Sequence, residues 1–367
     1  MINLIFSYKL NSYSGWGTLS LNYIHSFKKK KNIIVFCNAI NKKVKVLQYP
    51  ILRDPLAYLK NPLLILLDSY KIKRIIQNTK RIHRNEISAH FLVEPYVLFL
   101  FFLNSFFKNK IFYCIGTYSN ILATSIKFRF FFKKIILNLT DIIFLSKLTK
   151  KIILPKIFIN EKCNTQIINP FINIKKKFKK SKKKSLRLLS VGAIKKRKGY
   201  HNLISIMNIL INKYKFKVKL NIVGSVSESL YYNNLKEQIY LNKLNKFISI
   251  KNTVDNKKLN EYYINSDIFL LLSELDGLHF EGFGIVFLEA LAKQNMIIAS
   301  KYSGGPDIKF FLKDINVVSP SNHLKIASYI YKYYFNNLRN KKETNLNNFY
   351  TYNLNNKKKI NNFLSRF

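Results

Sequence analysis

Short runs of apolar residues alternate with longer mixed segments along residues 1–170 of the chain. This alternation is typical of β-α-β units, in which successive strands join one parallel sheet. The sequence Ser14-Gly15-Trp16-Gly17-Thr18 follows the first apolar run and predicts the turn into a helix that ends near Lys28. Strands are predicted at Ile2–Ser7, Ile33–Cys37, Ile87–Val93, Ile111–Ile115 and Asp141–Ser146.

The same pattern resumes after a basic run at residues 175–184, which must be solvated and extended because its charges repel one another. We therefore predict an α/β fold with two Rossmann-like domains, 1–172 and 186–336. A basic linker, 173–185, joins them, and a tail follows, 337–367, for which a helix is one option. In the second domain the pattern predicts strands at Leu186–Gly192, Val218–Gly224, Phe247–Ile250 and Asp267–Ser273, and helices through Asn212 and at Ser229–Leu241, Lys258–Asn265 and Ile285–Ala292.

The high net positive charge of the chain does not alter this prediction. The chain has 63 Lys and Arg residues against 18 Asp and Glu residues, a formal net charge of +45. A basic surface is the usual footprint of a nucleic-acid-binding protein. Lysine is enriched together with Asn, Ile, Phe and Tyr along the whole length, however, as an AT-rich coding sequence produces for any function. Because no nucleic-acid-binding signature accompanies the charge, we expect no specific nucleic acid partner.

Composition also bears on where the protein works. Apolar residues make up 48% of the chain, too many for a disordered protein. The cysteines, Cys37, Cys114 and Cys163, lack CxxC spacing, which indicates a reducing compartment without disulfides or structural zinc. The longest apolar run, Tyr96–Leu103, is too short to span a bilayer, and the first residues lack the pattern of a secretory leader. We therefore expect a cytoplasmic protein.

Candidate chemistry is concentrated between Glu274 and Asp307, where Glu281 and Glu289 have seven residues between them. Glu86 and Glu94 have the same spacing, so spacing alone is a weak signal. Only the first pair has glycines beside it. An apolar run that predicts a buried strand precedes that pair, and a helical pattern begins between its two members, so we take only this pair as a site.

A strand, a glycine-bearing loop and a helix N-terminus form an anion site, because backbone N–H groups and the positive end of the helix dipole face the loop. We predict that a phosphate binds there and that Glu289, one turn into the helix, accepts hydrogen bonds from a ribose diol. The alternative is an ordinary β-loop-α unit with a solvated glutamate. The loop residues predicted to take part are Gly282, Phe283, Gly284, Ile285 and Val286.

The block from Glu274 to Asp307 resembles the donor-sugar site of retaining glycosyltransferases of family 4. These have the GT-B fold, two Rossmann-like domains with parallel sheets facing a central cleft. The resemblance covers residues 185–335 well and the first domain weakly. It implies that Glu289 holds the ribose of a nucleotide-sugar donor, while Glu281 and the amides after it contact the transferred sugar. It further implies transfer with retention to a hydroxyl of a glycan or lipid-linked acceptor, in cell-surface polysaccharide or glycolipid biosynthesis.

The loop after Gly192 carries Arg197 and Lys198 and resembles the family segment that grips the donor diphosphate. Two fixed cations at the carboxyl end of a parallel strand suit that task. We predict Arg197 and Lys198 as catalytic residues, because positive charge stabilises a departing diphosphate. Glu281 is the third predicted catalytic residue, because the resemblance places it at the transferred sugar. The alternative is a solvated basic loop, and Ala193 stands where the family often has Arg.

Fewer candidates lie in the first domain. Gly15 and Gly17 are placed as the glycine-rich loop that faces the donor phosphates in related enzymes, with a plain tight turn as the alternative. His90 is predicted to bind the acceptor or transfer a proton, unless it is a core histidine. Ile115-Gly116-Thr117 resembles the family's His-Gly-Thr segment on the acceptor side, so Gly116 and Thr117 are acceptor candidates even though Ile115 replaces the histidine.

No Asp-x-Asp pair occurs in the chain, so nothing in the sequence suggests a metal bridge to the diphosphate. We predict no metal ligands and no cofactor besides the donor substrate. Two alternatives stay open. One is a different GT-B nucleotide-sugar enzyme, such as an epimerase; the other is a degenerate GT-B protein that only binds a partner, which Ile115 and Ala193 favour and the intact glutamate pair disfavours.

Residues 127–137 combine four basic residues with four phenylalanines on a predicted helix. A basic face beside an aromatic one allows a helix to lie on an anionic membrane. A core-facing apolar stripe with solvated lysines would have the same pattern. We expect attachment to the inner face of the plasma membrane through this segment.

Overall fold

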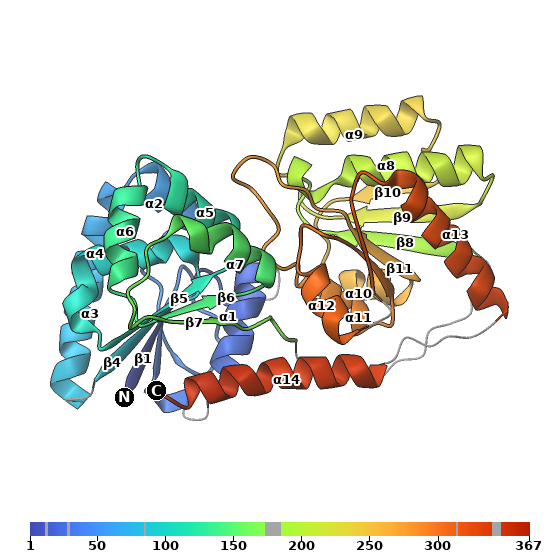
Figure 1. Ribbon diagram of the computed structural model, residues 1–367. Helices are drawn as coiled ribbons and strands as arrows, with labels where there is room; N and C mark the ends of the chain where they lie inside the picture. The colour runs from blue at the N-terminus through green and yellow to red at the C-terminus, as the bar shows by residue number, and fades with distance from the viewer. Residues whose placement is uncertain (12–13, 28–29, 84–85, 173–184, 313–314, 340–345) are drawn as a thin grey trace. The chain divides into compact units, whose positions relative to one another are not determined.

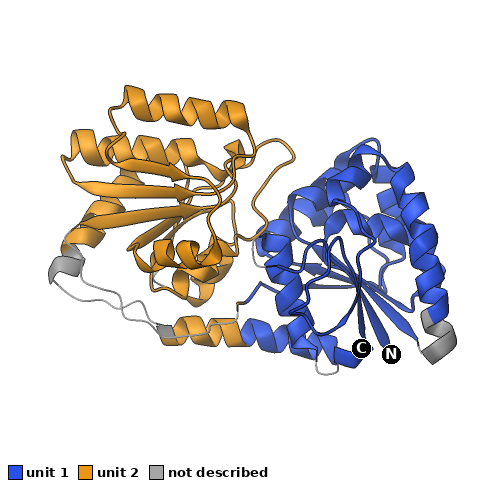
Figure 2. Ribbon diagram, turned by 180° about the vertical axis from the view of Figure 1, so that it is seen from behind, with its two compact units in different colours: residues 1–171, 355–367 blue, residues 172–354 orange. Residues whose placement is uncertain are grey.

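The computed structural model describes residues 1–11, 14–27, 30–83, 86–172, 185–312, 315–339 and 346–367 (Figure 1). The chain divides into two compact units (Figure 2). Unit 1 comprises Met1–Phe171 and Asn355–Phe367, and unit 2 comprises Ile172–Leu354. Nearly all of the predicted basic linker, 173–185, lies outside the described residues.

Unit 1 contains a seven-stranded sheet in the order β3-β2-β1-β4-β5-β6-β7. Every neighbouring pair is parallel. Every residue of β1, β2, β4 and β6 is buried, because helices cover both faces of the sheet, and this explains why most of their residues are apolar. The strands are β1 (Ile2–Phe6), β2 (Ile33–Phe36), β3 (Leu47–Tyr49), β4 (Ile87–Phe91), β5 (Asn109–Cys114), β6 (Asp141–Phe144) and β7 (Asn164–Ile167).

The helices of unit 1 connect these strands as crossovers. Short 3-10 turns complete the connections, among them η2 (Glu94–Phe99), which follows β4. The α-helices are α1 (Gly15–Ser26), α2 (Pro55–Lys60), α3 (Leu63–His83), α4 (Leu100–Leu103), α5 (Thr117–Thr124), α6 (Arg129–Leu137) and α7 (Lys147–Ile153).

Unit 2 contains a six-stranded sheet in the order β10-β9-β8-β11-β12-β13, again with every neighbouring pair parallel. The strands are β8 (Leu186–Val191), β9 (Val218–Val223), β10 (Ile248–Lys251), β11 (Ile268–Leu271), β12 (Met296–Ser300) and β13 (Ile315–Val318). The helical elements are η5 (Lys196–Lys198), α8 (Tyr200–Asn208), η6 (Ile209–Lys213), α9 (Ser229–Leu241), α10 (Asn256–Ile264), α11 (Val286–Leu291), α12 (Gly305–Phe311) and α13 (His323–Arg339).

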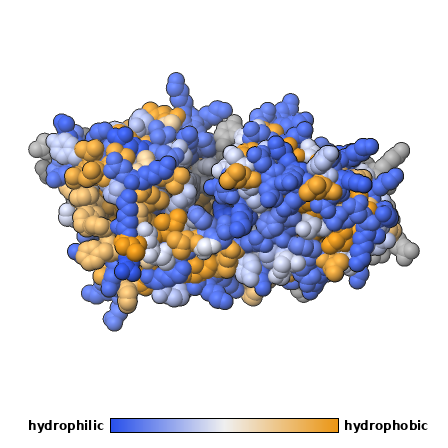
Figure 3. Space-filling model, turned by 90° about the horizontal axis from the view of Figure 1, so that it is seen from above, coloured by the Kyte–Doolittle hydropathy of each residue, from blue (hydrophilic) through white to orange (hydrophobic). Residues whose placement is uncertain are grey.

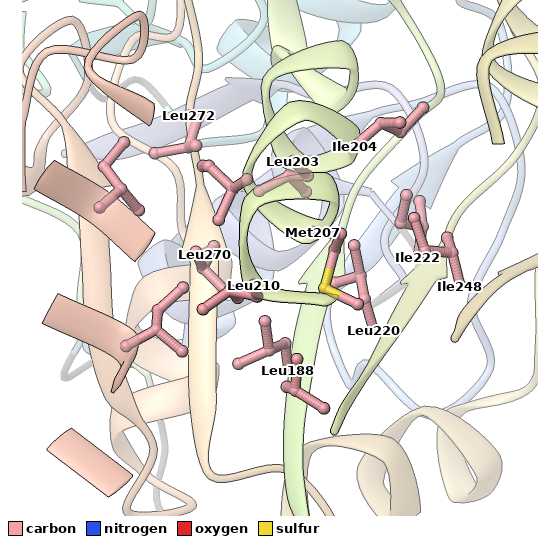
Figure 4. Packing of buried hydrophobic residues seen from close by; sticks show 14 of the residues in the cluster. Leu188, Leu203, Ile204, Met207, Leu210, Leu220, Ile222, Ile248, Leu270 and Leu272 are labelled. Carbon is pink, nitrogen blue, oxygen red and sulfur yellow. The ribbon is translucent and has the colours of Figure 1, made fainter. Parts of the chain in front are cut away.

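The core of unit 2 forms where α8 packs on the sheet (Figure 4). Leu203 and Met207 of α8 and Leu210 of the following η6 point toward Leu220 of β9 and Leu270 of β11, and all five side chains are buried. Burying such a side chain contributes about 1.5–3 kcal/mol. This cluster therefore holds β8 and β11, and the loops that follow them, in fixed positions.

The last helix, α14 (Leu346–Leu364), contributes its first residues to unit 2 and its last residues to unit 1. In unit 1, Ile360, Phe363 and Leu364 are buried. The sequence left a helix in this tail open.

The predicted α/β class with two parallel Rossmann-like sheets is confirmed. Three edge strands, β3, β7 and β13, were not predicted, because they are short, carry polar side chains and leave residues partly exposed. The buried strand β12 was not among the predicted strands either. In both sheets the strand order reverses beside the first strand, between β1 and β4 in unit 1 and between β8 and β11 in unit 2. Open α/β sheets bind their ligands at the carboxyl ends of the strands at this switch point.

Candidate active site

The loop after β8 approaches the end of β11 through a glycine. Gly199 has a φ of +68° and closes η5, and a Cβ at this position would lie 2.0 Å from the carbonyl oxygen of Leu272. Only glycine permits both the backbone angle and the close approach. Glu274 then donates its backbone N–H to the carbonyl oxygen of Arg197 at 2.9 Å. The loops after β8 and β11 are thus fastened together at the switch point of unit 2.

This contact brings three predicted catalytic side chains together. Arg197 Nη1 donates to Glu281 Oε2 at 2.8 Å, and Lys198 Nζ donates to the same oxygen at 2.5 Å. Arg197 Nη1 also lies 3.3 Å from the carbonyl oxygen of Phe280. We call Arg197, Lys198 and Glu281 the ion triad. With all three groups ionised it carries a net charge of +1, which suits an anionic ligand.

Burial and pairing act against each other in the ion triad. Burial would raise the pKa of Glu281, but the charges of Lys198 and Arg197 and their hydrogen bonds outweigh it and lower that pKa to about 2. Burial lowers the pKa of Lys198, and the charge of Glu281 opposes this shift. Glu281 is therefore ionised at every physiological pH, and it holds both cations in place.

The glycine-bearing loop before α11 is tightly packed. Gly284 has a φ of +89°, and a Cβ there would lie 2.8 Å from Cε2 of Phe287. Gly304 donates its N–H to the carbonyl oxygen of Phe283 at 2.8 Å, and a Cβ on Gly304 would lie 2.4 Å from Phe283 Cδ2. Gly282 is buried in the same loop, whereas Ile285 and Val286 are half-buried where α11 begins. We call residues 282–284 the glycine block. The loop after β12 packs against it through Gly304.

Glu289 lies on α11, where it is half-buried. Its Oε2 accepts a hydrogen bond of 2.7 Å from the hydroxyl of Tyr263 on α10. Burial raises the pKa of Glu289, and the bond from Tyr263 opposes this shift. Tyr263 was not among the predicted site residues, since one tyrosine on an amphipathic helix has no distinguishing signal in the sequence.

Gly192 and Tyr200 form a second contact that was not predicted. The hydroxyl of Tyr200 donates to the carbonyl oxygen of Gly192 at 2.7 Å. Gly192 has a φ of +150°, and a Cβ there would lie 3.4 Å from Nζ of Lys198. The positive φ, rather than the space beside Lys198, therefore favours glycine at this position.

In unit 1, Gly15 and Gly17 lie in the first turn of α1, where the N–H of Gly17 donates to the cap residue Ser14. A Cβ on Gly17 would lie 2.1 Å from the carbonyl oxygen of Asn11, whereas nothing lies within 4 Å of the corresponding position on Gly15. Gly17 is needed for packing. Gly15 faces open space.

His90 lies within β4 and has no exposed surface. Its Nδ1 pairs with the hydroxyl of Tyr23 at 2.7 Å and its Nε2 pairs with Oδ1 of Asn3 at 2.9 Å. Burial lowers the pKa of this imidazole to about 3. The predicted acceptor contact therefore needs correction, because this geometry is that of a neutral core histidine, the other alternative.

Gly116 caps α5 and is buried, and Thr117 begins that helix and is half-buried. The N–H of Gly116 donates to Oε1 of Glu94 at 3.0 Å. Glu94 was set aside together with Glu86, but the structure separates these two residues. The side chain of Glu86 is 56% exposed and pairs with Lys108, whereas Glu94 is 1% exposed. The signal that could have identified Glu94 is its position directly after the apolar run of a predicted parallel strand.

Two further expectations concern metals and membranes. The described part of the chain contains no group of three His, Cys, Asp or Glu side chains that could hold a metal ion. The prediction that no metal is required stays a prediction. Cys37, Cys114 and Cys163 are free and buried. None of the described helices combines the length and the apolar character that a bilayer span requires.

Solved structures similar to this chain share its fold along nearly their whole length. Anabaena HepE in complex with UDP and glucose is 12% identical with a TM-score of 0.69, covering 100% of this chain and 99% of that chain. A glycosyltransferase from Rickettsia africae is 18% identical with a TM-score of 0.67, covering 98% of both chains. The N-terminal domain of Candida albicans trehalose-6-phosphate phosphatase is 15% identical with a TM-score of 0.73, covering 100% of this chain and 96% of that one. These likenesses show the fold.

Sequence comparison identifies the family. No curated protein sequence matches the chain. Residues 171–348 match the family model described as glycosyl transferases group 1. This range contains the ion triad, the glycine block and Glu289, and it coincides closely with unit 2. Over this range, which is nearly half of the chain, the sequence is that of a group 1 glycosyltransferase, and the fold is that of the GT-B structures to which the chain is similar.

Proposed function

We propose that unit 2 binds a nucleotide sugar and that the enzyme transfers its glycosyl group to an acceptor hydroxyl with retention of anomeric configuration. The observation that carries this proposal is the ion triad at the switch point of unit 2. Arg197 and Lys198 converge there on one oxygen of Glu281, at 2.8 and 2.5 Å. Among the similar structures, HepE is in complex with UDP-glucose and the Escherichia coli trehalose-6-phosphate protein is bound with UDP-2-fluoro glucose, which supports a nucleotide-sugar donor here.

Each group has a role in this proposal. When the bond between the anomeric carbon and the diphosphate breaks, negative charge develops on the departing oxygen, and Arg197 and Lys198 stabilise it. Glu281 orients both cations and contacts the transferred sugar. Glu289 accepts hydrogen bonds from the ribose, and the amides of Gly282, Phe283 and Gly284 contact the sugar and phosphate. Because two protein cations supply the positive charge, we expect transfer to need no divalent metal, and EDTA should leave turnover unchanged.

A thermal-shift panel of UDP, GDP and ADP with their sugars tests this function. A ligand at a hundred times its dissociation constant adds about 2.7 kcal/mol of stability, so one nucleotide should raise the melting temperature clearly above the others. Free nucleotide released from the corresponding sugar donor then measures turnover, and a requirement for an acceptor distinguishes a transferase from an epimerase. If none of the nucleotides raised the melting temperature, unit 2 would not be a donor site.

We further propose that the acceptor is lipid-linked and that unit 1 lies on the inner face of the plasma membrane through α6. The predicted segment, 127–137, presents two kinds of phenylalanine. Phe128 and Phe132 are 5% and 1% exposed and pack in the core, whereas Phe130 and Phe131 are 59% and 41% exposed. A core-facing apolar stripe, the alternative for this segment, explains the buried Phe128 and Phe132 but not the exposed Phe130 and Phe131. Exposed aromatic side chains beside lysines are expected of a peripheral membrane helix.

The exposed aromatic surface continues onto α4. The rings of Phe101 and Phe131 lie 5.1 Å apart, and Phe101 is 44% exposed. Lys134 Nζ lies 4.6 Å from the ring of Phe130, and Lys133 Nζ lies 4.4 Å from the ring of Phe158. Apolar side chains gather on the surface that unit 1 forms (Figure 3). An anionic bilayer would bury the exposed aromatic rings in its apolar region and pair its headgroups with the lysines.

Changing Arg129, Lys133 and Lys134 to Glu should reduce partitioning onto anionic liposomes by at least a hundredfold, because each basic residue near such a surface contributes about 1 kcal/mol. Co-sedimentation measures this loss. The same charge change at three exposed lysines of unit 2, Lys236, Lys246 and Lys257, is the control and should have a smaller effect. Equal losses in the two variants would show that net charge, rather than α6, governs binding. Self-association without liposome binding would indicate that a second copy covers the surface.

A further inference from the structure

Glu94 occupies the switch point of unit 1 in the way that Glu281 occupies that of unit 2. It is the first residue of η2, just beyond the carboxyl end of β4, and it is 1% exposed. In the sheet, β4 lies between β1 and β5. The loops that follow those two strands carry Gly15, Gly17, Gly116 and Thr117, the residues placed beside the substrates on the basis of family resemblance.

The carboxylate of Glu94 bonds to both of these loops. Oε2 accepts a hydrogen bond of 2.9 Å from Nε1 of Trp16, between the two glycines that follow β1. Oε1 accepts a hydrogen bond of 3.0 Å from the N–H of Gly116, and the hydroxyl of Ser119 lies 3.5 Å from the same oxygen. The rings of Trp16 and Tyr118 lie 5.3 Å apart across the junction. One buried side chain thus connects the loops on either side of it.

A buried carboxyl group is costly unless its hydrogen bonds are satisfied. Burial raises the pKa of Glu94 to about 7, although the bonds from Trp16, Gly116 and Ser119 oppose this shift. An apolar side chain would fill the same space without this cost, but it could not accept two N–H groups from different loops. The geometry therefore indicates a requirement for accurately placed loops at this edge of the sheet.

We propose that Glu94 is a positioning residue, which fixes the Gly15–Gly17 turn and the Gly116–Thr117 turn so that unit 1 presents a preformed substrate surface. This role rests on the proposed glycosyl transfer. Glu94 acts through Trp16 and Gly116 and does not itself contact the reacting atoms. Each carboxylate oxygen accepts a hydrogen bond from one of the two loops, and loss of either bond frees one loop to move.

Trp16 is the only tryptophan in the chain, so the protein's tryptophan fluorescence reports on the surroundings of this one side chain. The ring of Tyr8 also lies 6.4 Å from that of Trp16, but burial raises the pKa of Tyr8 to about 12, so Tyr8 does not titrate near neutrality. In the wild type the fluorescence should change in one step near pH 7, as the carboxylate beside Nε1 ionises. Cys114 on β5 interacts electrostatically with Glu94, but burial raises the pKa of that thiol far above neutrality, so it does not titrate in this range. Glu94→Gln should abolish the step, and the matched exposed variant Glu86→Gln should keep it.

Turnover then distinguishes a positioning role of Glu94 from a purely structural role in folding. Nucleotide release is measured with the donor that the thermal-shift panel selects and a detergent-solubilised lipid extract as the acceptor pool. Glu94→Gln and Trp16→Phe should each lower turnover per folded molecule at least tenfold, and the double variant should lose little more, because both remove the same contact. The nucleotide-induced thermal shift, which reports on unit 2, should be unchanged.

Different failures have different meanings. If Glu94→Gln and Trp16→Phe lowered the melting temperature but kept turnover within twofold of the wild type, Glu94 would be a structural residue and this inference would be wrong. Independent, additive losses in the double variant would also contradict it. A wild type that shows no thermal shift with any nucleotide would instead overturn the proposed function.

Discussion

Replacing Arg197 and Lys198 together with Ala should lower donor affinity by at least a hundredfold and reduce turnover further. Each charge-assisted hydrogen bond to a phosphate contributes about 1.5–3 kcal/mol, so two lost partners correspond to two or more powers of ten. Isothermal titration with the selected nucleotide sugar measures the affinity. The matched control replaces Lys195 and Lys196 with Ala, a change that removes the same amount of charge from the same loop. Lys196 is exposed and pairs weakly with Asp276 at 3.8 Å, so this variant should lose little affinity.

The ion triad makes stability a competing explanation. Removing both cations leaves Glu281 buried and unpaired, which destabilises a fold by about 3–5 kcal/mol. A balanced variant, Lys198→Met with Glu281→Gln, removes one charge of each sign, and Arg197, whose side chain is 22% exposed, keeps the carbonyl oxygen of Phe280 as an acceptor. It should fold, yet it should lose turnover by at least a hundredfold. Wild-type turnover in the balanced variant, or equal losses in the two alanine pairs, would show that the basic loop has only a structural role.

The sequence predicted the main strands because of one physical circumstance. A strand covered on both faces, such as β2 or β11, is apolar at every position, and a continuous apolar run is easy to recognise. The edge strands β3 and β7 carry polar side chains such as Gln48 and Thr165, because one side of each meets solvent. The tail helix α14 was left open because asparagines and lysines separate its buried residues.

The members of the candidate site were more predictable than their contacts. Arg197, Lys198 and Glu281 were each selected, but the sequence assigned the cations to a diphosphate and the carboxylate to a sugar. It contains nothing to show that both cations bond one carboxylate oxygen, because that depends on the close approach of Gly199 to Leu272. Contacts between loops far apart in sequence need the sheet topology first.

Glu94 illustrates the same limit. It was set aside because no glycine lies near it in the sequence. In the fold, Gly116 donates to it from the turn after the next strand of the sheet, β5, and Trp16 donates to it from the start of α1, which follows β1 on the other side. Proximity along the chain was the wrong criterion, because parallel strands that are neighbours in a sheet are separated by whole crossover helices.

Changing Glu289 to Gln should weaken nucleotide binding by at least tenfold, with a corresponding loss in the nucleotide-induced thermal shift. Its carboxylate is half-buried and already accepts a hydrogen bond of 2.7 Å from Tyr263, which orients it. Hydrogen bonds from ribose hydroxyls to an ionised acceptor contribute about 1.5–3 kcal/mol, and an amide loses the charge. Glu86→Gln is the control, because that glutamate is exposed and has only Lys108 as its partner.

The pH dependence of nucleotide binding provides a second measure of Glu289. Burial raises the pKa of its carboxyl group, so Glu289 takes up a proton at a higher pH than an ordinary glutamate as the solution is acidified. Nucleotide affinity should therefore decline on acidification at a higher pH than an ordinary glutamate would cause, and Glu289→Gln should remove this decline. Tyr263→Phe should lower affinity less than Glu289→Gln, since it removes the orienting bond and keeps the acceptor. If Glu289→Gln bound nucleotide as tightly as Glu86→Gln, the ribose would have to be held elsewhere in unit 2.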